Sequence, residues 1–169
     1  MAFCSSWLHA DGFKEQRSGI EFPDKIGAYK RGKVTPYEAE PGKAGVAIEY
    51  RSEDAEATVY VRASAGGDYK TSEEFLKDTL RGIKALEAQG QYSNVKIYEV
   101  SADKEMPGWK SAAFTSSSTN RFIVSFAYCK VATGYSVKIR ATTENPKNEL
   151  LQSFSKAVQE LVDHAPKKP

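Results

Sequence analysis

The amino-acid sequence predicts an α+β fold, in which an antiparallel β-sheet of about seven to eight strands packs against a mid-chain helix and a C-terminal helix. Segments in which apolar and polar residues alternate, as in half-buried strands, occur in two runs, and short polar connections join the strands within each run. Each run is followed by one segment with the 3.6-residue period of an amphipathic helix. Short connections indicate antiparallel neighbours, and helices that follow runs of strands indicate α+β rather than a doubly wound sheet.

The first run contains four strand candidates, at residues 19–22, 29–37, 45–51 and 57–63. The second candidate contains Gly32 and Pro36, and because proline cannot donate a ladder hydrogen bond, we expect an edge or bulged strand there. The third and fourth candidates alternate cleanly between an apolar and a polar face. Their apolar positions are Val46, Ile48, Tyr50, Val59 and Val61. The polar residues between these two strands predict a hairpin connection.

Residues 71–89 form the first predicted helix, with an apolar stripe made of Leu76, Leu80, Ile83 and Leu86. Thr71 and Glu74 have the spacing of a capping box, and Gly90 stands where glycine commonly ends a helix. Gly82 lies inside the helix and lowers helix propensity by about 1 kcal/mol relative to alanine. We therefore expect a close packing contact at Gly82.

The second run contains four more strand candidates, at residues 95–101, 111–117, 121–131 and 135–143. The third of these is apolar on both faces, which predicts a central strand covered on both sides. The final helix is expected to start at Asn145 as N-cap, with Pro146 at the first helical position, where its missing N–H costs nothing. An apolar stripe then continues to Val162.

The chain length fits one domain, because domains run at roughly 100–200 residues. We expect a leader at residues 1–17, a single α+β domain at 18–163 and a tail at 164–169. Residues 1–10 contain no Lys, Arg, Asp or Glu and look like the last part of a signal peptide; the alternative is an ordinary apolar arm. The signal interpretation predicts a periplasmic or secreted protein, and the alternative predicts a cytoplasmic one. No transmembrane segment is expected, since the longest uncharged apolar run has eight residues, against about 18–20 for a spanning helix.

One stretch, residues 134–162 (GYSVKIRATTENPKNELLQSFSKAVQELV), shows a strand with outward Lys138 and Arg140 that runs through a polar turn into the final helix. With this stretch and its element order, the chain resembles the Mog1/PsbP-like class over roughly residues 18–163, and in particular small secreted or lipid-anchored bacterial proteins. The resemblance implies an antiparallel sheet with one mid-chain and one C-terminal helix. It also implies a role in binding other macromolecules rather than in catalysis. No family site can be matched residue by residue in this sequence.

The composition and the absence of known motifs argue against most classes of catalytic, cofactor and metal site. Twenty-four basic and 22 acidic residues leave a net charge of +2, which is too balanced to predict a nucleic-acid partner. Two cysteines and two histidines are too few for the common metal and iron–sulfur sites, and the sequence lacks the phosphate-binding, dinucleotide-binding and hydrolase motifs. We therefore expect no catalytic residue, no cofactor and no metal. Cys129 lies in an apolar strand and is expected to be a buried small hydrophobe.

Three residues are candidates for contact with a partner. Tyr60 and Arg62 share one face of a strand, where they would either contact phosphates and bases or be ordinary polar side chains on the outward face of the sheet, and the second alternative is favoured. Trp109 follows Pro107 and Gly108 in a turn, and it is either a lid over the edge of the core or an exposed anchor for a partner. The lid is favoured because tryptophan is usually mostly buried.

These observations lead to one leading functional hypothesis and two alternatives. The leading hypothesis is a non-catalytic extracytoplasmic binding or interaction domain, whose partner is another protein or an envelope component. The first alternative is a carrier of a small molecule or lipid, with a pocket between the sheet and the helices. The second alternative is an enzyme with an unfamiliar site built from tyrosine, lysine and carboxylate side chains.

Overall fold

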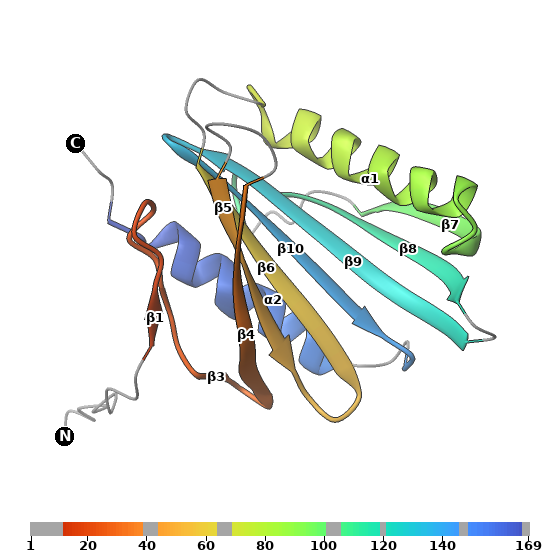
Figure 1. The fold of residues 1–169 in the computed structure, drawn as a ribbon, viewed down its shortest axis with the longest axis horizontal. Coiled ribbons are helices and arrows are strands. Elements are labelled where there is room, and N and C mark those ends of the chain that lie inside the picture. The colour runs from red at the N-terminus through yellow and green to blue at the C-terminus, as the bar shows by residue number, and fades with distance from the viewer. Residues whose placement is uncertain are drawn as a thin grey trace.

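The structure, a computed structural model, describes residues 12–38, 44–63, 69–100, 106–118, 121–145 and 149–166. In chain order its elements are β1 (Phe13–Lys14), β2 (Glu21–Phe22), β3 (Lys25–Ile26), β4 (Tyr29–Glu38), β5 (Ala44–Arg51), β6 (Ala55–Ala63), α1 (Ser72–Ala88), β7 (Ser93–Val100), β8 (Lys110–Ser118), β9 (Arg121–Ala132), β10 (Tyr135–Thr143) and α2 (Glu149–Asp163). Strands β3 to β10 form a curled antiparallel sheet on which the two helices pack (Figure 1). The predicted α+β fold, an antiparallel sheet with a mid-chain and a C-terminal helix, is confirmed.

The sheet joins two parts of the chain that are distant in sequence. Its strand order is β3-β4-β5-β6-β10-β9-β8-β7, so each run of strands forms a series of antiparallel neighbours. The runs meet where β6 pairs with β10, with Val61 opposite Val137 and Val59 opposite Ile139. This one pairing therefore fixes how the side chains of the two runs face each other.

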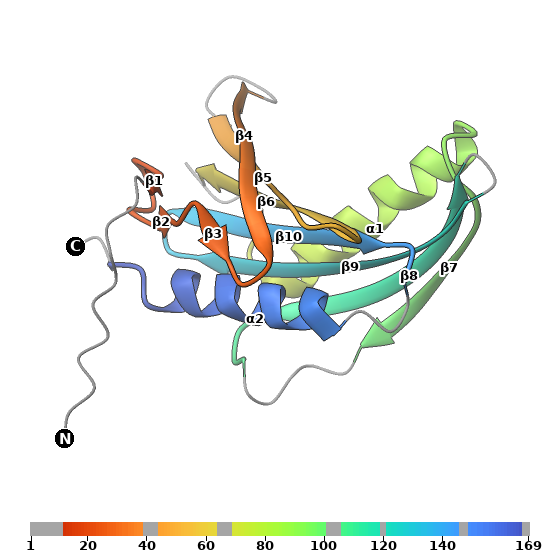
Figure 2. The same cartoon turned by 90° about the horizontal axis from the view of Figure 1, so that it is seen from below.

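The two helices lie on opposite faces of the sheet (Figures 1 and 2). Helix α2 packs on β10, and its Phe154 reaches aromatic side chains of β4 and β5. The large core on this face includes Ile48, Val59, Ile139, Leu151 and Val158. Helix α1 packs instead on β7, β8 and β9, where Ile83, Val95 and Phe114 form a smaller core. On the α1 face, the helix therefore covers mainly one half of the sheet.

Two strand predictions depend on position in the sheet, and the structure agrees with both. Strand β4 is bulged at Gly32, because its register with β5 shifts between Arg31 and Val34, while Pro36 pairs in register with Val46. It also lies next to the edge, since its outer neighbour β3 has two residues. Strand β9 is interior, between β10 and β8. The fully buried Cys129 faces α1, and Tyr128 packs against the core on the α2 side, so both faces of this part of β9 are covered.

The described chain starts with a short strand pair that includes residues of the predicted leader at 1–17. Phe13 pairs with Phe22 across β1 and β2, and the buried carboxylate of Glu15 accepts hydrogen bonds from backbone N–H groups of the turn between these strands. Strand pairing therefore begins ahead of the predicted domain boundary. Residues 1–10, which carry the signal-like pattern, lie outside the described residues, so the location of the protein stays a prediction.

Helix α1 starts as its capping residues predict. Thr71 Oγ1 accepts a hydrogen bond from the Glu74 backbone N–H at 3.1 Å, and the Glu74 carboxylate accepts one from the Lys70 backbone N–H at 2.8 Å. Gly90 follows the helix with φ of 74°, a conformation that glycine adopts without strain. The predicted start of α2 includes Pro146, which lies outside the described residues. Within the described ranges, neither helix is long and apolar enough to cross a membrane.

Candidate functional site

A cleft separates α1 from the half of the sheet that this helix does not cover. Its volume is about 480 Å³, within the range of roughly 300–1,000 Å³ that small-molecule sites occupy. The lining combines aromatic and aliphatic side chains with three cations and one carboxylate. Helix α1 contributes Phe75, Asp78, Thr79, Gly82, Ile83 and Leu86, the sheet contributes Tyr37, Tyr60, Arg62, Lys138 and Arg140, and Tyr69 precedes the helix.

The pleat and the register of the sheet build one wall of the cleft. Side chains alternate between the faces of a strand, so Tyr60 and Arg62 of β6 lie on the α1 face together with Lys138 and Arg140 of β10. The register places Lys138 opposite Tyr60, and the Lys138 ammonium lies 4.5 Å from the centroid of the Tyr60 ring. The Tyr37 ring of β4 meets the Tyr60 ring edge-on, with centroids 6.4 Å apart. This wall is both basic and aromatic.

The helix side supplies a second aromatic pair and the carboxylate. The Tyr69 ring stacks on Phe75 with centroids 4.5 Å apart. The Tyr69 hydroxyl donates to Asp78 Oδ2 at 2.6 Å, and Arg81 donates to Asp78 Oδ1 at 3.1 Å. Both oxygens of the carboxylate in the cleft are therefore already hydrogen-bonded to neighbours.

The environment of the cleft opposes positive charge on Lys138. Burial is the main cause that lowers the pKa of Lys138, and the guanidinium groups of Arg140 and Arg62 add to it, while Cys129 and the Asp78 carboxylate act in the opposite direction. Among the described residues, Lys138 makes no ion pair, and its ammonium lies over the Tyr60 ring. Burial also raises the pKa of Tyr37, so its phenol is protonated at neutral pH. Lys138 is thus a partly buried cation with no ion pair among the described residues.

Arg140 closes one end of this cleft. It donates to the Tyr92 hydroxyl, and its guanidinium carbon lies 5.6 Å from the centroid of the Tyr92 ring and 5.7 Å from that of Phe114. Beyond Arg140 lies a second hollow of about 760 Å³ with a polar lining that includes Arg121 and Glu144, which form an ion pair. Its charges are thus partly compensated.

Gly82 does not make the close packing contact that the sequence predicts. A Cβ atom added at Gly82 would meet no heavy atom within 4 Å. The prediction is wrong because Gly82 lies on the side of α1 that borders the cleft rather than against a neighbouring strand. The glycine therefore keeps part of the cleft open.

Cys129 lies on β9 beneath α1, as a buried small hydrophobe. It is 0% exposed, and its sulfur lies 3.6 Å from Thr79 Oγ1. Burial raises the pKa of the Cys129 thiol to about 11. The prediction that this cysteine is buried is confirmed, and the protonated thiol is a poor nucleophile at neutral pH.

Cys129 in the folded protein is expected to resist thiol reagents. In a Cys4→Ser background, labelling by 5,5′-dithiobis(2-nitrobenzoate) at pH 8 should be slower than in urea by on the order of 100-fold, because the folded thiol is both covered and protonated. Stopped-flow absorbance in the two conditions measures the ratio. Equal rates in the folded and the unfolded protein would contradict the buried placement.

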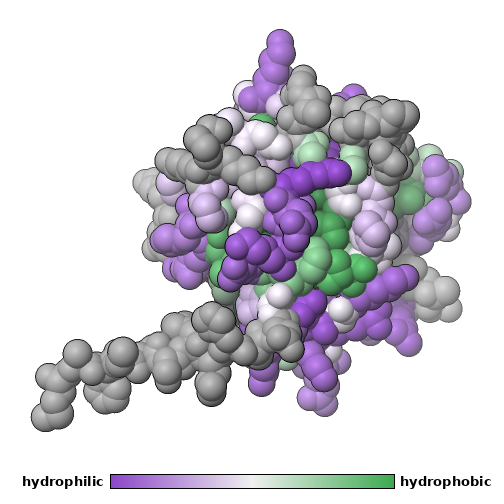
Figure 3. Space-filling view, turned by 60° about the vertical axis from the view of Figure 1, so that its left-hand side comes forward, coloured by the Kyte–Doolittle hydropathy of each residue, from purple (hydrophilic) through white to green (hydrophobic). Residues whose placement is uncertain are grey.

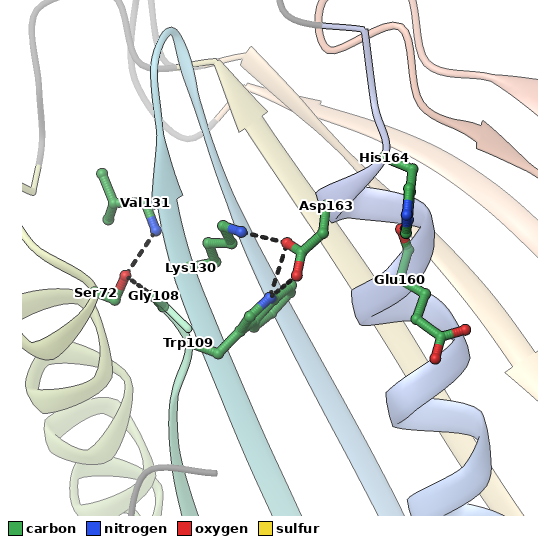
Figure 4. Close-up of polar contacts among 8 residues, drawn as sticks. All are labelled: Ser72, Gly108, Trp109, Lys130, Val131, Glu160, Asp163 and His164. Carbon is green, nitrogen blue, oxygen red and sulfur yellow. Dashed lines mark hydrogen bonds and ion pairs between the residues drawn. The ribbon is translucent and has the colours of Figure 1, made fainter. Parts of the chain in front are cut away.

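Trp109 lies away from Tyr60 and Arg62, on the α2 side of the sheet. It is 4% exposed and belongs to the large core. Its Nε1 donates to Asp163 Oδ1 at 3.1 Å, and Lys130 forms an ion pair with the same carboxylate (Figure 4). The structure therefore makes Trp109 a lid over the core, and the alternative of an exposed anchor is wrong.

A further hollow lies at the end of α2, next to β1, β2 and β3. Its volume is about 1030 Å³, and its lining includes Ile20, Ile26, Ala157 and Leu161. Figure 3 looks toward this end of the molecule and shows apolar surface framed by hydrophilic side chains. Lys14 and Glu21, which also line it, are exposed and form an ion pair with each other.

The sequence indicated only part of the cleft. Tyr60 and Arg62 were predicted as contact residues, and the alternation of the last strand placed Lys138 and Arg140 on one outward face. These four side chains lie together because β6 pairs with β10, and no local feature of the sequence predicts that pairing. Tyr37, Tyr69 and Asp78 were missed because their places in the cleft depend on the pairing of β4 with β5 and on the packing of α1. In the described part of the chain, no cluster of three or more His, Cys, Asp or Glu residues is placed to hold a metal ion.

Comparisons with known proteins leave the family open. No protein-family model matches the sequence, and no curated protein matches it. Among solved structures, the chain is similar to PA94, a protein of unknown function from Pseudomonas aeruginosa. The two are 12% identical with a TM-score of 0.38, and the similarity covers 94% of this chain and 96% of that chain. A similarity at this TM-score carries no argument about the function of the chain.

Proposed function

We propose that this domain binds a small organic molecule in the cleft between α1 and the sheet, and does so without catalysis. The observation that carries the proposal is the cleft itself, about 480 Å³ between a helix and a sheet, with polar groups at a few defined places in an apolar lining. Of the functions that the sequence leaves open, the carrier with a pocket between sheet and helices fits this geometry best.

The lining supports binding better than chemistry. The carboxylate of Asp78 is held by Tyr69 and Arg81, and the raised pKa of Tyr37 keeps its phenol protonated. General acid–base catalysis needs a group that can exchange a proton near neutral pH within reach of the substrate. Asp78 and Tyr37 are not arranged for that task.

The concave shape also favours a small ligand over a protein partner. Large exposed apolar side chains are the usual anchors of protein interfaces. The aromatic residues of the cleft face one another across β4 and β6 or stack at the start of α1. Trp109, the one tryptophan in the described residues, is buried on the other face. The Mog1/PsbP-like resemblance stays a hypothesis about the fold class.

Substitution of Gly82 tests whether the cleft is the binding site. In the Gly82→Phe variant, the new ring would occupy space that is open in the native protein, and affinity for the neutral fluorescent probe N-phenyl-1-naphthylamine should fall at least about tenfold. The matched control is Gly82→Ala, which meets no atom within 4 Å and should bind as the native protein does.

Circular dichroism and thermal melting of both variants show whether they are folded. The alanine variant should be more stable than the native protein by up to about 1 kcal/mol, because alanine favours helix. Probe binding that is unchanged in a folded Gly82→Phe variant would exclude the cleft as the binding site. Loss of binding in both variants would equally contradict the proposal.

A further inference from the structure

We infer that the ligand of the cleft is an aromatic organic anion, whose carboxylate, sulfonate or phosphate lies at Lys138 and Arg62 and whose ring lies against the tyrosines. The inference rests on the proposed small-molecule cleft and specifies the class of ligand. It follows from two independent features of the lining, the Lys138 ammonium, which has no ion pair among the described residues, and the arrangement of the aromatic rings.

The position of Lys138 in the cleft favours an anionic ligand. Of the described residues, Arg62, Lys138 and Arg140 line it together with the carboxylate of Asp78. That carboxylate already accepts hydrogen bonds from two neighbours, while Lys138 makes no ion pair with any described residue. A buried cation without a partner is destabilising, because it has lost water without gaining a counter-charge. An anionic group at this point would supply that counter-charge through charge-assisted hydrogen bonds.

The positive groups are held in fixed positions. Lys138 and Arg62 project from adjacent strands, and the pairing of β6 with β10 sets their separation along the sheet. The Tyr60 ring lies under the Lys138 ammonium at 4.5 Å, which orients the lysine by a cation–π contact. The anion-binding part of the cleft therefore rests on the rigid sheet.

The aromatic rings provide the second half of the site. Tyr37 and Tyr60 contribute a pair on the sheet side, and Tyr69 and Phe75 contribute a stacked pair at the start of α1. Aromatic pairs prefer offset-stacked or edge-to-face arrangements, so walls of this kind favour a planar ring in the ligand. A neutral aromatic molecule would use these rings alone, and an inorganic anion would use the cations alone.

The test compares two probes that share one ring skeleton. 8-Anilino-1-naphthalenesulfonate is N-phenyl-1-naphthylamine with an added sulfonate, so the ratio of their affinities reports the contribution of the negative charge. The native protein should bind the sulfonate at least about tenfold more tightly, as expected of a charged group that pairs in a desolvated site. In Lys138→Met this preference should disappear, while the affinity for the neutral probe should change less than twofold.

Controls separate the charge from other causes. Lys96 lies exposed on β7, so Lys96→Met removes one positive charge elsewhere and should leave both affinities unchanged. Thermal melting checks that Lys138→Met is folded. Sodium sulfate at 10 mM, with ionic strength matched by sodium chloride, should not displace the aromatic sulfonate, because the ring contributes to its binding.

Each contrary outcome identifies what fails. Equal affinity of the native protein for the two probes, or an unchanged preference in Lys138→Met, would contradict the proposal that the ligand carries an anionic group. Full displacement by sulfate would contradict the proposal that an aromatic ring of the ligand contributes to binding. If neither probe binds the native protein, or if both probes bind Gly82→Phe as tightly as they bind the native protein, the cleft is not the binding site. The inference about its ligand then fails as well.

Discussion

The Trp109→Ala variant is expected to lose about 3–5 kcal/mol of the free energy of unfolding, the range for truncation of a large buried aromatic side chain. The ring is 4% exposed and packs in the large core. Its Nε1 also donates to Asp163, which forms an ion pair with Lys130, and the Lys130 ammonium lies 5.7 Å from the centroid of the indole ring. Truncation therefore opens a cavity and removes one of the donors to that carboxylate. Urea denaturation measures the loss.

The Trp109→Phe variant separates packing from the hydrogen bond. Phenylalanine keeps most of the apolar contact but cannot donate to Asp163, so a smaller loss of about 1–3 kcal/mol is expected. The side chains of Lys130 and Asp163 are 20% and 24% exposed, which leaves their ion pair partly solvated and able to persist in the variant. A loss below 1 kcal/mol in Trp109→Ala would contradict the placement of this residue in the core.

The Phe154→Ala variant is expected to lose a similar amount, about 3–5 kcal/mol. Phe154 of α2 is 2% exposed, and its ring centroid lies 4.5 Å from that of Tyr29 and 5.2 Å from that of Tyr50. These contacts attach α2 to β4 and β5. Urea denaturation of Phe154→Ala, beside the exposed helix position Gln152→Ala, measures the effect.

Two further readouts make the Phe154 prediction specific. The Gln152→Ala control should change stability by less than about 0.5 kcal/mol, as for other exposed positions. Affinity for N-phenyl-1-naphthylamine should be unchanged in Phe154→Ala at temperatures where it stays folded, because α2 and the cleft lie on opposite faces of the sheet. A large loss of stability in the control, or a loss of probe binding in folded Phe154→Ala, would contradict this division.

The two faces of the sheet differ because the helices cover them to different extents. On the α2 face, residues of β5, β6 and β10 join those of α2 in one continuous core. On the α1 face, the helix packs on β7, β8 and β9 and leaves Tyr60 of β6 and Lys138 of β10 beside it. The first arrangement stabilises the fold, and the second leaves space for a ligand.

The sequence predicted the elements whose periodicity is long and regular. The alternation of β5, β6 and β10 and the Thr71 cap of α1 depend on neighbours in sequence, and the structure agrees with them. Strands β1 and β3 were missed because two residues cannot show a period. Gly82 was misjudged because a glycine in a helix can mark either a close contact or an open space, and only the packing of α1 decides between them.

The candidate site was less predictable than the fold. Tyr60 and Lys138 lie opposite each other only because β6 pairs with β10, and no local property of either strand specifies that partner. Trp109 shows the same dependence, since a tryptophan after a Pro-Gly turn can lie over the core or outside it. Its burial against α2 is settled by contacts with Asp163 and Lys130, which are distant in sequence. Tertiary contacts, and not local sequence patterns, thus determine the positions of the Tyr60–Lys138 pair and of Trp109.

The most direct test of the cleft as a binding site is a titration of the ¹⁵N-labelled protein with 8-anilino-1-naphthalenesulfonate, followed by amide chemical shifts. The cleft predicts that the largest shifts fall on α1 and on the neighbouring strands, at Thr79, Gly82 and Lys138. The competing place for an aromatic probe is the apolar hollow beside α2, at Ala157 and Leu161. Shifts confined to that hollow, with Gly82 and Lys138 unmoved, would contradict the account.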